Sequence, residues 1–189
     1  MTDETIADRY RRRAATFTET VASVPAGAWS APSPCPDWDA RAVVAHVTGT
    51  QSTFAGLVGR QLDPGPSVDD DPLAAWTAAR DQTQAALDAP SLAREPFEGF
   101  AGPSTFEISV DRFLSFDLVV HRWDLARAAG VDDVIPARDL AAMESAIVEL
   151  SEQMGEQMRG GGAFGPALTP PEGADPQTRV LAFLGRRAW

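Results

Sequence analysis

Apolar residues recur every three or four positions over most of this chain, and this spacing places them on one face of an α-helix. The long helices that this pattern predicts cover 5–24, 39–58, a segment opening at Asp71-Pro72, 107–129 and 137–158. Proline and glycine interrupt 28–38 and 90–104, so we expect turns and irregular loops there and no strand. A short helix follows Asp175-Pro176 and ends at Gly185.

Capping residues indicate where these helices begin and end. Asp39 is the expected N-cap of the second long helix, with Asp37 as its competitor, and Gly130 ends the fourth. Three glycines stop the fifth helix, and the loop 163–174 after it has a mobile or lid-like composition. Long helices joined by short or irregular loops favour an all-α antiparallel bundle, which we expect to form one domain over 1–189.

Charge and composition exclude several classes of function. The net charge is −11, from 27 acidic against 16 basic residues, so the surface should repel a phosphate backbone and nucleic acid is not expected as a partner. The single cysteine excludes an intramolecular disulfide and any zinc site built from several cysteines. The acidic N-terminus has no signal-peptide pattern, and no apolar run is long enough to span a membrane. A cytoplasmic protein is expected.

The two histidines of the chain suggest a metal site. His121 follows Asp117 by four residues in the predicted helix 107–129, so an imidazole and a carboxylate share one helix face, on an apolar stripe. His46 lies on the apolar stripe of the helix 39–58. A buried carboxylate needs a partner or a metal. Two imidazoles and one carboxylate suit Zn²⁺, or Ni²⁺, Fe²⁺ or Mn²⁺, with one coordination position left open.

A structural interpretation accounts for the same pattern without metal. Asp117 and His121 would then form a hydrogen-bonded pair and His46 would be a core histidine. Four further residues are candidates for the surroundings of the site. Three roles are open for Cys35: a fourth metal ligand, a nucleophile, or a small core residue. Two are open for Asp124: a carboxylate that orients an imidazole, or an exposed or capping carboxylate. Trp38 and Trp123 line a pocket beside the metal or belong to the core.

Three segments together resemble one family, the metal-binding domain of mycothiol-dependent maleylpyruvate isomerase within the DinB-like superfamily. They are CPDWD at 35–39, VVAHVTG at 43–49 and DLVVHRWDLA at 117–126, and the tail 174–186 is similar to the end of single-domain members. The resemblance covers nearly the whole chain. It implies a DinB-like four-helix bundle and a divalent metal, usually zinc, held at positions matching His46, Asp117 and His121. Two positions depart from the isomerase pattern, with aspartate for glutamate at Asp117 and arginine for glycine at Arg122.

The resemblance also sets the functional expectations. We expect a transferase or isomerase that uses mycothiol, or another low-molecular-weight thiol, as cosubstrate on a small electrophilic substrate. We do not expect the isomerase activity itself, because we expect this chain to lack the additional C-terminal domain that the isomerase carries. Two alternatives stay open: a metal-dependent hydrolase with Asp124 as its acid/base group, and a non-catalytic metal-binding or small-molecule-binding protein. No catalytic side chain is assigned, and a homodimer through bundle faces fits the family.

Overall fold

The computed structural model describes residues 4–99, 102–154 and 165–189. These residues group into two compact units, Met1–Asp133 and Val134–Trp189, and each is considered by itself below. The expectation of a single domain stays a prediction. In the part of the chain that the structure describes, no helix combines the length and the apolar character needed to cross a bilayer.

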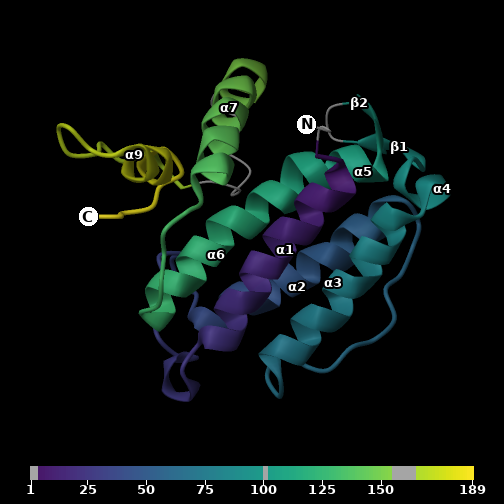
Figure 1. The fold of residues 1–189 in the computed structure, drawn as a ribbon, viewed down its shortest axis with the longest axis horizontal. Coiled ribbons are helices and arrows are strands. Elements are labelled where there is room, and N and C mark those ends of the chain that lie inside the picture. The colour runs from purple at the N-terminus through teal and green to yellow at the C-terminus, as the bar shows by residue number, and fades with distance from the viewer. Residues whose placement is uncertain (1–3, 100–101, 155–164) are drawn as a thin grey trace. The chain divides into compact units, whose positions relative to one another are not determined.

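The first unit is an antiparallel four-helix bundle of the DinB-like type, which confirms the expected all-α fold. Its helices lie side by side (Figure 1), with α1 packed on α3 and α6, and α2 packed on the same two helices. Their bounds are α1 Ile6–Ser23, α2 Ala40–Leu57, α3 Pro72–Asp88 and α6 Ser115–Ala129. The apolar stripes of all four meet in one core, in which Phe17 and Trp76 pack edge to face with their ring centroids 4.9 Å apart.

The capping residues behave as the sequence predicts. The side chain of Asp39 accepts a hydrogen bond from the backbone N–H of Ala42, and Asp71 does the same for α3, with Pro72 in the first turn. Gly130 ends α6 in the left-handed conformation with a φ of 68°. Asp37, the competing N-cap, instead lies in the turn before α2.

The segment 90–104 differs from the expected irregular loop. A short helix, α4 Pro90–Ala93, leads into an antiparallel hairpin, β1 Pro96–Gly99 with β2 Gly102–Thr105, so the expectation of no strand was wrong. Both strands are only four residues long and contain proline and glycine, which hides the alternating pattern of a strand. A short 3₁₀ turn, Ala26–Ala28, also precedes the Pro-rich segment.

The predicted helix 107–129 is not a continuous α-helix. It begins as α5 Phe106–Ser109, passes through a wider π-helical turn at Val110–Leu114 and continues as α6. The wider turn rotates the side chains that precede α6, and Phe113 within it is 36% exposed.

The second unit consists of α7, Ala137–Met154, packed on α9, Pro176–Phe183. Asp175 caps α9 by accepting from the Thr178 N–H, as expected, and Leu168 N–H donates to the Ala182 carbonyl. The predicted end of the fifth helix at 158 and the three glycines at 160–162 lie outside the described residues. The interpretation of 163–174 as a lid stays a prediction.

Candidate metal centre

The packing of α2 against α6 brings the three predicted ligands together. Asp117 lies between the two histidines: its Oδ1 is 3.1 Å from His121 Nε2, and its Oδ2 is 3.3 Å from His46 Nε2. One ligand atom from each residue lies within 4.8 Å of the other two. The two imidazole rings approach with their centroids 4.7 Å apart. The i,i+4 spacing on α6 and the stripe position on α2 therefore produce a cluster of the expected composition.

The cluster lies at the edge of the core rather than inside it. The His121 side chain is 7% exposed, but about a third of His46 and of Asp117 is exposed, at 31% and 30%. The expectation that all three residues lie on buried stripes was wrong for His46 and Asp117, whose side chains are partly exposed. Val43 and Val47, on either side of His46 in α2, are buried, so helical rotation turns the imidazole toward the boundary between α2 and α6. The His46 and Asp117 side chains are therefore partly accessible from outside the bundle, although Asp117 Oδ2 itself is buried.

Asp117 and His121 stabilise each other's charged form. Burial opposes ionisation of Asp117, but the charge and hydrogen bond of His121 hold the pKa of this carboxyl well below its ordinary 3.8. Burial likewise opposes protonation of His121, but the charge of Asp117 and hydrogen bonds with Asp117, Asp124 and Cys35 raise its pKa well above 6.5.

The side chains fit a divalent cation. Asp117 Oδ2 is buried and has no hydrogen-bond partner among the described residues, although His46 Nε2 is close to it. A carboxylate oxygen close to an imidazole nitrogen, without a hydrogen bond between them, fits two ligands of one ion. Zinc with bonds of about 2.0–2.1 Å places tetrahedral nitrogen and oxygen ligands about 3.3 Å apart, close to the two distances from Asp117. The group is small enough for a single ion.

The opposite nitrogen of His121 meets a second, buried group. His121 Nδ1 lies 3.0 Å from Asp124 Oδ2, and Asp124 is 0% exposed. The Cys35 thiol donates to the same oxygen at 3.2 Å, and Cys35 Sγ lies 4.0 Å from Nδ1. Of the two roles open for Asp124, the geometry matches the one that orients an imidazole. Cys35 lies on the Nδ1 side of His121, away from the Asp117 carboxylate, and does not join the group of His46.

The contact between Cys35 and Asp124 had no signal in the sequence beyond the shared family motifs. It depends on the turn that precedes α2. Trp38 N–H donates to the Cys35 carbonyl at 3.2 Å, Pro36 takes the second position, and Asp37 has a φ of 65° at the third. These features fit a type II turn, in which aspartate tolerates the left-handed conformation better than most residues.

The two tryptophans separate into different roles. The Trp38 ring lies against both imidazoles, with centroids 4.7 Å from His46 and 5.7 Å from His121. It therefore covers one side of the cluster, as a pocket residue would. Trp123 is 0% exposed, and among the described residues its ring contact is with Arg127, 5.6 Å from the ring centroid. Trp123 matches the core interpretation.

Comparison with known proteins identifies the family of this chain. The family model for the mycothiol maleylpyruvate isomerase N-terminal domain matches residues 10–126, a range that contains His46, Asp117 and His121. The chain belongs to this family. An uncharacterized protein of Mycobacterium tuberculosis, present in strains CDC 1551 / Oshkosh and ATCC 25618 / H37Rv, is 26% identical over 182 residues, covering 94% of this chain and 95% of the relative. No solved structure matches significantly.

Family and fold together describe a mycothiol-related, DinB-like domain with a candidate metal site.

Proposed function

We propose that this protein binds one divalent cation, zinc first, through His46, Asp117 and His121, and uses it with a low-molecular-weight thiol such as mycothiol to transfer or isomerise a small electrophile. The observation that carries the proposal is Asp117 Oδ2, a buried oxygen that faces His46 Nε2 without a hydrogen bond. Family membership supports the thiol. When bound, the ion would hold the thiol in its deprotonated, nucleophilic form.

Three side chains would orient, bind or shield the ion. Asp124 accepts the Nδ1 proton of His121 and so leaves the Nε2 lone pair for coordination. Asp117 lies between the two histidines with one oxygen toward each. Trp38 packs against both rings and limits water on its side of the cluster. The exposed parts of His46 and Asp117 leave access for a thiol and a second reactant. A deprotonated thiol needs no general base, which agrees with a site without a further carboxylate in this group.

Metal-assisted hydrolysis receives less support. It requires an acid/base group near the open coordination position, and Asp124 was the candidate. Asp124 is fully buried and bonded to His121 Nδ1 and the Cys35 thiol, on the far side of the imidazole from Asp117. A non-catalytic binding protein stays the second candidate, because the same cluster would bind metal without turnover.

The first experiment is elemental analysis of the protein purified without chelator or added metal, followed by zinc titration. We expect about one equivalent of metal per chain. His46→Ala and Asp117→Asn should each lose stoichiometric binding, and Asp70→Asn, a control at an exposed loop carboxylate, should keep it. Full stoichiometry in His46→Ala would remove His46 from the ligand set. No metal after reconstitution would overturn the proposal.

The thiol step needs a separate measurement. Cobalt-substituted protein should develop a near-ultraviolet thiolate-to-cobalt absorption band when mycothiol is added, and the band should be absent when the corresponding alcohol replaces the thiol. Metal binding without this band would favour the non-catalytic alternative. If the band appears but no electrophile is consumed, the protein binds the metal and the thiol without catalysing a reaction.

A further inference from the structure

The boundary between α2 and α6 continues beyond the metal ligands. His46, Thr50 and Phe54 follow each other at intervals of four residues on α2 and therefore share one face of this helix. On the other side of the boundary, Phe113 precedes Asp117 by four residues, in the π-helical turn that leads into α6. His46 Nε2 is 3.3 Å from Asp117 Oδ2, and the ring centroids of Phe54 and Phe113 are 6.2 Å apart. Both contacts thus lie along one boundary.

A cavity lies at the Phe54–Phe113 end of this boundary. Its volume is about 280 Å³, close to the roughly 300 Å³ at which small-molecule sites begin. Phe54 and Leu57 of α2 form one wall, Phe97 of the hairpin another, and Ile108 and Phe113 a third. Ile108 is 41% exposed and Phe113 is 36% exposed, so apolar side chains also reach the surface beside the hollow. Exposed apolar groups around a hollow are typical of ligand-binding grooves.

The polar groups of the lining are already engaged. The hydroxyls of Ser104 and Ser109 lie 3.1 Å apart and hydrogen-bond to each other. Arg112, the charged residue of the described lining, has an interaction partner of its own. A charged ligand group would have to compete with these contacts, whereas an apolar group is buried without displacing them. The cavity therefore favours an uncharged, apolar ligand.

One small molecule can reach both the cavity and the metal ligands. Phe54 lies eight residues from His46 on α2, which corresponds to about 12 Å along the helix axis. Phe113 lies one helical turn from Asp117, or about 6 Å. A substrate with its reactive carbon at the metal cluster therefore needs a linker of only a few atoms to place an apolar group in the cavity.

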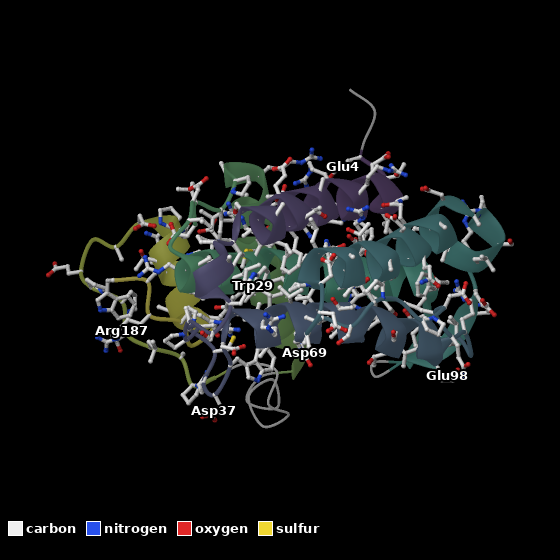
Figure 2. The ribbon with its side chains drawn as sticks, turned by 90° about the horizontal axis from the view of Figure 1, so that it is seen from below. Glu4, Trp29, Asp37, Asp69, Glu98 and Arg187 are labelled. Atoms are coloured by element: carbon white, nitrogen blue, oxygen red, sulfur yellow. The ribbon has the colours of Figure 1, made fainter. Side chains whose placement is uncertain are left out.

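The turn before α2 and the hairpin approach this boundary from different ends. Figure 2 shows Asp37 of the turn and Glu98 of the hairpin toward opposite ends of the bundle. Trp38, next to Asp37, packs against both imidazoles, and Phe97, next to Glu98, lines the cavity. The metal cluster is therefore covered from the turn, and the cavity lies toward the hairpin.

From these observations we propose that the cavity binds the unreactive part of the substrate, so that the electrophile carries an uncharged apolar body of about one aromatic ring. This inference rests on the function proposed above and names the substrate class of that site. The body packs among Phe54, Phe97 and Phe113, while the reactive carbon lies beside His46 and Asp117. Selection between substrates comes from the burial of apolar surface and not from charge.

Two vinyl ketones that differ only in this body test the substrate class. Methyl vinyl ketone has no apolar body, and phenethyl vinyl ketone carries a phenyl ring on two methylenes. In both, the thiol sulfur bonds to the terminal alkene carbon, and the alkene electron pair moves to the carbon beside the carbonyl. That carbon takes a proton from water, in place of the one that the thiol released. We expect kcat/KM to be at least ten-fold higher for the phenethyl compound, after each value is divided by the uncatalysed rate of the same ketone with mycothiol.

Binding to the metal-free protein gives a measurement that does not depend on turnover. Phenethyl ethyl ketone and methyl ethyl ketone match the two substrates in shape but have no alkene for a thiol to attack. We expect phenethyl ethyl ketone to shift the amide NMR signals of Ser109 and Phe113 and to bind at least ten-fold more tightly than methyl ethyl ketone. Equal affinities, or shifts confined to residues outside the lining, would overturn the proposal.

Variants of the lining test whether the preference for the phenyl ring arises in this cavity. Ile108→Trp should fill the cavity and abolish the ten-fold preference, and Phe97→Ser should reduce the preference by removing one wall. Leu92→Trp, at an exposed apolar residue outside the lining, should leave the preference unchanged. A preference that survives in both Ile108→Trp and Phe97→Ser would refute the site.

Zinc uptake and the thiolate-to-cobalt band, measured on the same variants, separate this inference from the function on which it rests. We expect Ile108→Trp to keep both, because Ile108 is not among the metal ligands. A protein that takes up zinc and forms the band but does not distinguish the two vinyl ketones would overturn the substrate class alone. A protein that prefers phenethyl ethyl ketone but takes up no zinc would overturn the proposed function, and with it the assignment of the cavity to a substrate.

Discussion

The strongest quantitative expectation concerns Asp124, which lies outside the proposed ligand set. Its Oδ2 accepts the Nδ1 proton of His121 at 3.0 Å and the Cys35 thiol proton at 3.2 Å, in a fully buried position. Asp124→Asn keeps a carbonyl oxygen that can accept from Nδ1 but removes the negative charge. A hydrogen bond to a charged group contributes about 1.5–3 kcal/mol and a neutral one about 0.5–1.5 kcal/mol. The loss of about 1–1.5 kcal/mol corresponds to roughly ten-fold weaker metal binding.

A second substitution at position 124 should weaken zinc binding further. Asp124→Leu leaves the buried Nδ1 proton of His121 without an acceptor, and an unsatisfied buried donor costs about 1–3 kcal/mol on its own. Added to the lost charge, this penalty amounts to about 2–4.5 kcal/mol, so zinc binding should weaken by at least about 30-fold, toward or beyond the upper end of the range known for residues that orient metal-bound histidines. The order wild type, Asp124→Asn, Asp124→Leu is the specific expectation.

Zinc affinity would be measured by competition with a chromophoric chelator at constant pH, beside Asp70→Asn as a surface control. Urea unfolding of the metal-free variants would be measured separately, because removal of a buried charge can also lower folding stability. If Asp124→Asn bound zinc as tightly as the wild type while remaining folded, the orienting role of Asp124 would be refuted. An equal loss of affinity in Asp70→Asn would point to bulk electrostatics instead.

Three further expectations follow from the structure. The raised pKa of His121 contributes stability to the metal-free protein that is present below pH 6.5 and lost as pH rises through the folded-state pKa. Zinc requires the neutral imidazole, so calorimetry should find that the thermal shift on adding zinc is larger at about pH 8 than at about pH 6, and a constant shift would contradict this. Tyr10→Phe removes the donor of Gln51 Oε1, 2.8 Å away in the core, and should lower the free energy of unfolding in urea by about 1–3 kcal/mol. Gly130→Ala, at a φ of 68°, should lower it by about 1–2 kcal/mol, although its new methyl group would meet no atom within 4 Å; an unchanged midpoint would argue against the left-handed end of α6.

The helices were predictable because their signals are local. Asp39 and Asp71 cap helices through their own side chains, and Gly130 ends one because its backbone must turn left-handed. Each of these signals needs only neighbouring residues. The hairpin of β1 and β2 has no such local signal, because its short strands contain proline and glycine and depend on each other for pairing. The spacing of apolar residues therefore could not predict this hairpin.

The candidate ligands were predictable for a related reason. Asp117 and His121 are four residues apart on one helix, so their proximity requires only that the helix forms. His46 could be placed on the correct stripe, but its exposure depends on how α2 rotates against α6, which is a tertiary property. Cys35 and Asp124 meet across 89 positions of sequence. Long-range contacts of this kind leave no periodic trace, and here only the order of the family motifs indicated that the segments belong together.

The different burial of the ligands suggests how the site reconciles affinity with access. His121 is held at both ring nitrogens, by Asp117 on one side and by Asp124 on the other, and it is almost completely buried. Such a residue loses little freedom on binding an ion. His46 and Asp117 are partly exposed, so the proposed reactants would approach the ion from their side of the cluster. A cluster buried at all three positions would hold an ion but exclude a thiol. Three exposed ligands would lose more side-chain conformational entropy when they bind the ion. One fixed and two accessible ligands satisfy both requirements of the proposed function.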